Sequence, residues 1–264
     1  MCSSDLDKYS DFGNATSPRL GATMRIPGFD ALRLKASWGQ GFRAPDLSDL
    51  YGATAFSASS AVDYWGCQQR GLSQEDCPAN QQFETWIGSN PNLDAEDSET
   101  FSIGAEYTFM GDWVASINYF KLILNNSIEY TGAQDQLDVD FNSGGNNPNV
   151  VRDPSGAVIS ISAGYQNGGV EFERDSLDYA LRGSYDTDFG TFGAALNMTQ
   201  YLNYDSELSY GTGQLYNAVD GLGFPEWRTN LFLSYNMGNW FANLNWDYIG
   251  ESSSRTSTRS EEHT

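Results

Sequence analysis

MGNWFANLNWDYIG, residues 237–250, decides the fold that we expect, because its side chains alternate strictly in character. Four apolar residues alternate with three polar ones: Ala242, Leu244, Trp246 and Tyr248 against Asn243, Asn245 and Asp247. Successive side chains of a β-strand point to opposite faces of a sheet, so this pattern is typical of a strand with one apolar face. The apolar face ends in two large aromatic rings. The environment that this face contacts decides which class of β-protein the chain belongs to.

The same alternation recurs along most of the chain. We count eight strands with it, near Leu20–Met24, Leu32–Gly39, Phe101–Phe109, Trp113–Leu124, Leu177–Asp186, Phe192–Thr199, Leu231–Tyr235 and 242–248. A period of two over this many segments predicts an all-β, antiparallel protein.

The connections between these strands alternate between short and long. Short turns rich in Gly, Asp and Asn join successive pairs: PGFDA (27–31), MGD (110–112), TDFG (187–190) and MGN (237–239). Long polar segments separate the pairs, at about 45–97, 130–159 and 204–224. Tight hairpins need these turn residues, and outer-membrane β-barrels place short turns on one side of the membrane and long loops on the other. The pattern therefore predicts a transmembrane β-barrel.

A barrel in lipid explains the aromatic end of the first stretch. We expect Ala242 and Leu244 to face lipid and Trp246 and Tyr248 to lie at the membrane interface, where amphipathic rings are favoured. The polar partners of these residues would face the barrel interior. An antiparallel sandwich with one solvated face also produces alternating strands, and this alternative stays open.

Composition excludes some classes of protein. The 264 residues carry a formal charge of −21, which argues against a nucleic-acid partner because phosphates are bound by Lys and Arg. No stretch approaches the roughly 18 consecutive apolar residues of a membrane helix. The first residues do not have the basic and then apolar pattern of a signal peptide.

Four segments carry a resemblance to a known family. GQGFRAPDLSDLYG (39–52) is similar to a signature of TonB-dependent outer-membrane receptors, and NPNLDAEDSETFSIGAEY (90–107) resembles a later segment of the same family. The matching positions are Gly41, Phe42, Arg43, Ala44, Pro45, Leu50, Tyr51, Asn90, Pro91, Leu93 and Glu96. Residues 150–185, in which an Asn-x-Gly element introduces a long strand, and FPEWRTNLFLSY (224–235) resemble further parts of these receptors in the same order. This sequence has Asp94-Ala95 where the family usually has Lys-Pro, which adds negative charge to a loop.

The resemblance implies a fold and a function. It implies a partial barrel, about eight strands of a larger, plugged barrel of about 22 strands, in the outer membrane of a Gram-negative bacterium. It also implies active import of a scarce small-molecule nutrient (siderophore, vitamin, oligosaccharide or peptide). Energy would come from the TonB-ExbB-ExbD system acting on a plug domain that we do not find in this sequence. No enzymatic activity and no cofactor are expected. The rivals are a passive porin, a barrel-embedded enzyme and a secreted β-sandwich binding protein.

The two ends of the sequence fit neither the strand pattern nor the family. MCSSDL (1–6) and RSEEHT (259–264) resemble translated sequencing adapters, so we expect the receptor barrel to span residues 7–258. Removing Asp5, Arg259, Glu261 and Glu262 changes the charge from −21 to −19. The sole histidine, His263, would then be foreign, which leaves no histidine for a catalytic triad or a metal site. Cys2 would be foreign too.

The longest loop then contains a pair of cysteines, Cys67 and Cys77. In an extracellular loop a disulfide is the natural expectation, and a pair of free thiols is the alternative. Four aromatic residues of the same loop either contact ligand or pack the loop against itself: Tyr64, Trp65, Phe83 and Trp86.

A second loop, residues 134–147, contains three carboxylates, Asp135, Asp138 and Asp140. Calcium takes several such oxygens, but the spacing does not match an EF-hand loop, so we expect a solvated loop and no metal site. No pair of carboxylates can be placed at a catalytic separation from the sequence, and we expect no catalytic residues.

Overall fold

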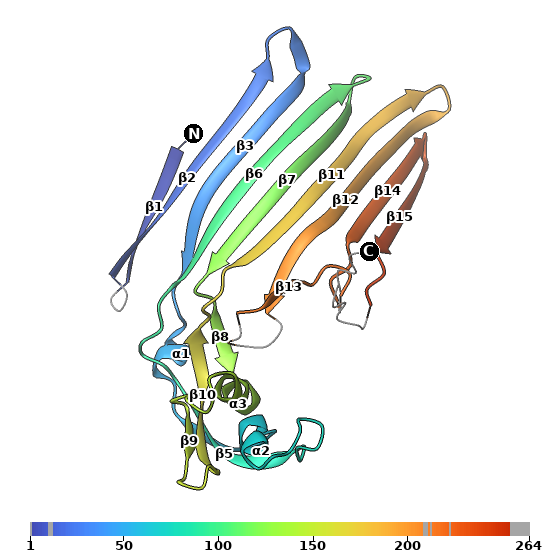
Figure 1. Ribbon diagram of the computed structural model, residues 1–264. Helices are drawn as coiled ribbons and strands as arrows, with labels where there is room; N and C mark the ends of the chain where they lie inside the picture. Colours follow the sequence, from blue (N-terminus) through green and yellow to red (C-terminus); the bar gives the residue numbers. More distant parts are fainter. Residues whose placement is uncertain (1, 10–12, 208–210, 212, 222, 254–264) are drawn as a thin grey trace, which may run out of the picture.

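The computed structural model describes residues 2–9, 13–207, 211, 213–221 and 223–253. They form one long antiparallel sheet and, at one end of it, a smaller mixed sheet with short helices (Figure 1). His263 and the segment 259–264 lie outside the described residues, as do parts of the predicted loop 204–224.

The long sheet follows the chain order, and each strand pairs antiparallel with its neighbours. Its strands are β1 (Cys2–Tyr9), β2 (Gly13–Ile26), β3 (Phe29–Arg43), β6 (Glu96–Phe109), β7 (Trp113–Asn125), β11 (Phe172–Thr187), β12 (Gly190–Glu207), β14 (Trp227–Met237) and β15 (Trp240–Ile249). A short strand, β13 (Leu215–Asn217), pairs with the end of β12. The eight strands predicted from alternation correspond to β2, β3, β6, β7, β11, β12, β14 and β15, which confirms the all-β, partial-barrel prediction.

Strand β1 was not predicted, since Cys2–Leu6 show no alternating pattern. Its backbone nevertheless pairs with β2, from Cys2 opposite Leu20 to Tyr9 opposite Gly13. The physical reason is that ladder hydrogen bonds use only backbone groups. The open edge of a strand is therefore a template for nearly any extended segment.

From β2 to β15, short turns lie at one end of the long sheet and long connections at the other (Figure 1). The turn glycines Gly28, Gly111 and Gly238 have φ values of 81°, 80° and 55°, which side chains with a Cβ rarely adopt. At the opposite end, residues 44–95 join β3 to β6, and residues 126–171 join β7 to β11. This is the asymmetry that the sequence predicted.

Pairing register gives the long sheet one apolar face and one polar face. An apolar row runs across five strands: Leu34, Ala105, Ile117, Tyr179 and Met198. The adjacent row on the other face is largely polar: Arg33, Glu106, Ser116, Ala180 and Asn197. The apolar face is open, with Leu244 56% and Ile117 43% exposed. Trp246 and Tyr248 stack on it at a ring distance of 5.9 Å, as expected for an interfacial pair.

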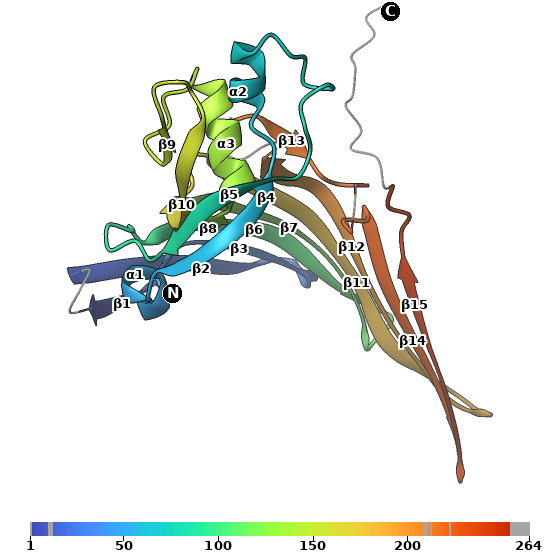
Figure 2. The ribbon, with the colours of Figure 1, turned by 90° about the horizontal axis from the view of Figure 1, so that it is seen from below.

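The long connections are folded, not irregular. Their elements are α1 (Leu47–Tyr51), β4 (Ala55–Ala61), α2 (Tyr64–Gln69), β5 (Gln81–Gly88), β8 (Ile128–Thr131), α3 (Ala133–Asn142), β9 (Val150–Arg152) and β10 (Val158–Asn167). We call the structure formed by residues 44–95 and 126–171 the loop module. Figure 2 shows that the long sheet is curved and that α2, α3 and β9 project away from it.

A five-stranded sheet holds the two loops of the module together, in the order β4-β5-β10-β8, with β9 on β10. The contact between the loops is the parallel pair β5–β10, from Thr85 opposite Ile161 to Gly88 opposite Gly164. A Cβ on Gly164 would lie 2.2 Å from the carbonyl oxygen of Gly88, so this close approach requires glycine.

The buried apolar cluster of the described residues lies in the loop module. It consists of Ala61, Ala133, Leu137, Val150 and Ile161, with Phe83 and Val158 packed against it. No helix in the described part of the chain is both long and apolar enough to cross a bilayer.

Candidate functional site

The two receptor-like segments meet where the long sheet becomes the loop module. Arg43, the last residue of β3, pairs in register with Glu96, the first residue of β6. The guanidinium donates from Nε at 2.5 Å and from Nη2 at 2.6 Å to the Glu96 carboxylate. Glu96 also accepts a hydrogen bond from the backbone amide of Ile128 at 2.7 Å, which ties the second loop to the same point. These residues therefore fix the base of both loops.

Other positions of these segments are also structural. Leu50 and Leu93 are buried, 1% and 3% exposed. The amide of Asn90 donates to the Tyr165 carbonyl at 3.2 Å and so links the first loop to β10. Pro45 is buried, Gly41, Phe42 and Ala44 are half-buried, and Arg43, Tyr51 and Pro91 are exposed. The structure thus brings most of these positions together at the joint between the long sheet and the loop module.

The predicted disulfide between Cys67 and Cys77 is present. Cys67 lies in α2 and is 1% exposed, and Cys77 follows in the loop to β5. The bond closes the segment between α2 and β5.

An ion cluster that the sequence did not predict holds the module together. Arg152 of β9 donates to Asp63 at 2.7 Å and to Asp140 at 2.6 Å, and these side chains are 9%, 5% and 0% exposed. Its guanidinium also lies over the Trp65 ring, 4.4 Å from the centroid. Burial opposes ionisation of Asp63, but hydrogen bonds from Arg152 and from the Gly66 amide outweigh it, so its pKa lies below the ordinary value.

The expectation of a solvated aspartate loop was wrong. Residues Ala133–Asn142 form helix α3, because Leu137 and Gln136 are buried against the small sheet. The three carboxylates have separate partners: Asp135 accepts from the Gly132 amide, Asp138 from Gln134, and Asp140 from Arg152 and the Asn147 amide. Burial and the nearby Asp135 raise the pKa of Asp138. In the part of the chain that the structure describes, no group of acidic, cysteine or histidine side chains could hold a metal ion.

Three of the four candidate loop aromatics pack the module against itself. Tyr64 contacts Phe141 of α3 edge to face, Trp65 lies under Arg152, and Phe83 packs on the apolar cluster. Trp86 differs, because it is 44% exposed and lines a groove. The structure therefore keeps one of the four available to a ligand.

That groove, of about 400 Å³, lies along the joint between β5 and β10. We call it the amide groove because amides and hydroxyls dominate its lining: Thr54, Trp86, Ser89, Asn90, Thr131, Gln136, Asn149, Ser162, Tyr165 and Gln166, with backbone from Gly88, Ala163 and Gly164. Several of these groups are fixed by one another. Gln166 donates to the Thr131 hydroxyl at 3.2 Å, and Asn149 donates to the Gln136 side chain at 3.1 Å.

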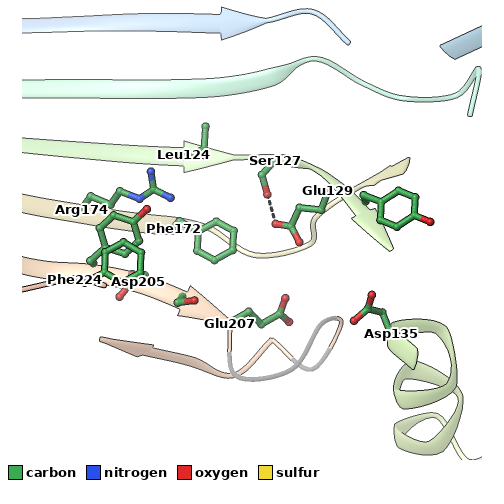
Figure 3. A pocket seen from close by; sticks show the side chains of 12 residues that line it. Leu124, Ser127, Glu129, Asp135, Phe172, Arg174, Asp205, Glu207 and Phe224 are labelled. Carbon is green, nitrogen blue, oxygen red and sulfur yellow. Dashed lines mark hydrogen bonds between the residues drawn. The ribbon is translucent and has the colours of Figure 1, made fainter. Parts of the chain in front are cut away.

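A second pocket, of about 460 Å³, lies where β7, β11 and β12 pass into the loops (Figure 3). We call it the mouth pocket. Its lining contains four carboxylates and one guanidinium, Glu129, Asp135, Asp205, Glu207 and Arg174, and four aromatic rings, Tyr130, Phe172, Tyr204 and Phe224. In Figure 3 the side chains of Glu207 and Asp135 point toward one another across the opening. The Arg174 guanidinium lies 4.2 Å above the Tyr204 ring, which also packs on Phe224.

The two pockets are neighbours. Tyr130 of the mouth pocket and Tyr165 of the amide groove are paired across β8 and β10, with ring centroids 5.5 Å apart. Neither pocket was predicted, since their residues come from segments far apart in the sequence. Only Trp86 of the predicted aromatics signalled the amide groove.

Comparisons with known proteins agree with this architecture. The chain matches the family model described as TonB dependent receptor-like, beta-barrel, over residues 4–262. No curated protein sequence matches it. Among solved structures, a mutant of the ferric enterobactin receptor PfeA from Pseudomonas aeruginosa is 16% identical with a TM-score of 0.59, covering 92% of this chain and 29% of that one. The siderophore receptor PirA from Acinetobacter baumannii is 16% identical with a TM-score of 0.58, covering 94% of this chain and 31% of that one.

At 16% sequence identity, the likeness to these two solved structures establishes the fold alone. The chain spans about 29–31% of the length of those two solved receptors.

Proposed function

We propose, since the chain belongs to the TonB-dependent receptor-like β-barrel family, that it is the loop-bearing part of an outer-membrane receptor that binds a small molecule and imports it with energy from TonB. Proteins of this family are receptors and transporters of the Gram-negative outer membrane. The observation that carries the proposal is the asymmetry of the long sheet, with four tight hairpins at one end and a folded loop module with two pockets at the other.

The solved neighbours support the kind of ligand that such receptors import. PfeA is a ferric enterobactin receptor, PirA is a siderophore receptor, and the Serratia marcescens receptor HasR was solved in complex with its hemophore and heme. The family match favours a receptor over the passive porin and the secreted sandwich.

Surface labelling tests the orientation that this function requires. We expect Ser155→Cys, an exposed residue of the loop module, to react with a membrane-impermeant maleimide on intact cells. The matched variant Asn239→Cys lies in the β14–β15 turn and should react only after the outer membrane is opened. The opposite labelling pattern, or labelling of soluble protein in the medium, would rule out the proposed orientation.

Uptake tests the energy source. The receptor that carries this segment should accumulate its ligand in cells with TonB and lose accumulation, while keeping binding, in cells without it. Equal uptake in both strains would instead indicate a passive channel. Ligand conversion without transport would indicate an enzyme.

We also propose that residues 1–6 and 259–264 derive from sequencing adapters and are not native. The likeness of both ends to the same library chemistry supports this. The family match covers residues 4–262 and so overlaps both segments. The sequence of the source DNA therefore decides whether the two segments are native. Genomic DNA that encodes these twelve residues in place would overturn the proposal.

A further inference from the structure

The loops of the receptor carry a large excess of negative charge. Residues 44–95 contain seven acidic residues and one basic residue, residues 126–171 contain six and one, and residues 208–226 contain two and none. The sum is fifteen acidic against two basic side chains, a net charge of −13. A surface of this sign repels anions and lowers their rate of association.

The two basic loop residues do not offset this charge where a ligand would bind. Arg152 is buried and paired with Asp63 and Asp140, so it is not available to an anionic ligand. Arg70 lies at the end of α2, donates to the Cys67 sulfur at 3.4 Å, and lines neither pocket. The one cation that lines either pocket is Arg174 of β11, which lies over the Tyr204 ring and shares the mouth pocket with four carboxylates. An anionic metal chelate would therefore meet an excess of negative charge in the mouth pocket and no cation in the amide groove.

The amide groove has the chemistry of a site for uncharged, hydroxyl-rich molecules. Its side chains donate and accept hydrogen bonds without a fixed charge, and no charged residue is among its described lining. The hydrogen bonds within the site hold Gln136, Asn149 and Thr131 in fixed orientations. The Trp86 ring is held by its indole hydrogen bond to Glu84 at 2.8 Å and by an edge contact with Phe56. A fixed ring can pack against the apolar face of a sugar.

The mouth pocket continues this chemistry toward the polar face of the long sheet. Carboxylates such as Glu207 and Asp135 accept hydrogen bonds from hydroxyl groups. Tyr204 and Phe224 add ring surface, and Tyr130 joins the mouth pocket to Tyr165 of the groove. A chain of linked rings bearing hydroxyls would contact both sites at once.

We propose that the ligand of this receptor is an uncharged, polyhydroxylated molecule of the oligosaccharide class, bound in the amide groove and the mouth pocket, and not an anionic ferric chelate. This inference rests on the proposed receptor function and names the substrate class of the same site.

The test measures binding to the receptor that carries this segment, purified in detergent and shown to be folded by its heat-modifiable migration. The probes are neutral gluco-, manno-, xylo- and fructo-oligosaccharides of about four to eight units, ferric enterobactin, and a lysine-rich hexapeptide; their size suits pockets of this volume. We expect a neutral oligosaccharide to bind most tightly, with an affinity that changes less than about twofold between low and high salt, since uncharged ligands are not screened.

Two variants locate the site. Trp86→Ala should weaken oligosaccharide binding about 10- to 30-fold, the loss typical of truncating an aromatic contact at the centre of a site. Trp240→Ala removes another exposed tryptophan, at the opposite end of the long sheet, and should leave binding unchanged.

Tighter binding of ferric enterobactin or of the peptide than of every oligosaccharide would overturn the ligand class and leave the receptor function standing. Failure of a folded receptor to bind any oligosaccharide would also overturn it. Surface labelling and TonB-dependent uptake test the receptor function separately, so the two failures are distinguishable.

Discussion

The long sheet and the loop module come from one chain, yet they place their apolar side chains in opposite environments. Ile117 and Leu244 of the long sheet are 43% and 56% exposed, whereas Leu137 and Ile161 of the module are 1% and 0% exposed. The sheet has an open apolar face that needs lipid, and the module has its own core, a disulfide and a buried ion cluster. Both regions contain apolar side chains, and they differ in what surrounds these side chains: lipid for the long sheet and a protein core for the module.

Removing the central cation should break the module and spare the sheet. Arg152→Ala leaves Asp63 and Asp140 buried without their partner, and losing one member of a buried ion pair costs about 3–5 kcal/mol. We expect hydrogen exchange to rise across β9, β10 and α3 and to stay unchanged in β6 and β7. Arg70→Ala, which removes an exposed cation from the same module, is the control and should have little effect. Equal exchange in both variants would contradict the proposed role of Arg152.

A charge on the apolar face should affect the sheet and spare the module. Ile117→Arg places a cation toward lipid, which costs about 2–4 kcal/mol near the bilayer midplane. Ser116→Arg places the same group on the polar face beside Glu106 and should cost much less. Urea unfolding of the receptor in lipid vesicles measures both. A similar loss for both variants would mean that the two faces are not lipid and interior.

The disulfide should have a smaller effect, confined to one end of the module. Cys67→Ser with Cys77→Ser should lower the stability of the module by about 2–3 kcal/mol, because the bond restricts the unfolded chain. Limited proteolysis should then cut between α2 and β5, and treatment of the unmodified receptor with a reductant should reproduce the pattern. Resistance of the double variant to the protease would show that packing around α2 suffices.

Acid should have the smallest effect, and its sign follows from Asp63. Its folded pKa lies below the ordinary value of 3.8, so this carboxylate stabilises the module above that value and loses its contribution as the pH falls through the folded pKa. We expect no change between neutral pH and about pH 5, and looser packing of the module below about pH 4, seen as faster proteolysis by an acid protease. In Arg152→Met burial should instead raise the pKa of Asp63, so the loosening of the module by acid should be lost.

The long sheet could be predicted because its signal is local. Alternation in a segment such as Leu231–Tyr235 indicates which side chains lie on opposite faces of the strand. A turn such as MGN (237–239) indicates that the two flanking strands form a hairpin. The family segments added that the barrel is part of a larger, plugged one, and the Arg43–Glu96 pair shows what two of these segments do together: each supplies one half of the joint.

The module could not be predicted in the same way. Asp63, Asp140 and Arg152 come together from two loops, and no spacing motif connects them. Strands β5 and β10 pair over four residues each, without a neighbouring turn to indicate it. One signal was available: Arg152 is the only basic residue in 126–171, among six acidic ones, and a lone cation in such a segment often pairs with them.

The parallel pair β5–β10 also determines how these loops can be altered. Thr85 and Ile161 are 76 positions apart in the sequence (161 − 85), so the small sheet closes only after both loops are in place, a late and slow event in folding. Neither loop has a complete structure without the other. Grafting the binding surface onto another barrel would therefore require moving residues 44–95 and 126–171 as one unit, together with the Arg43–Glu96 joint beneath them.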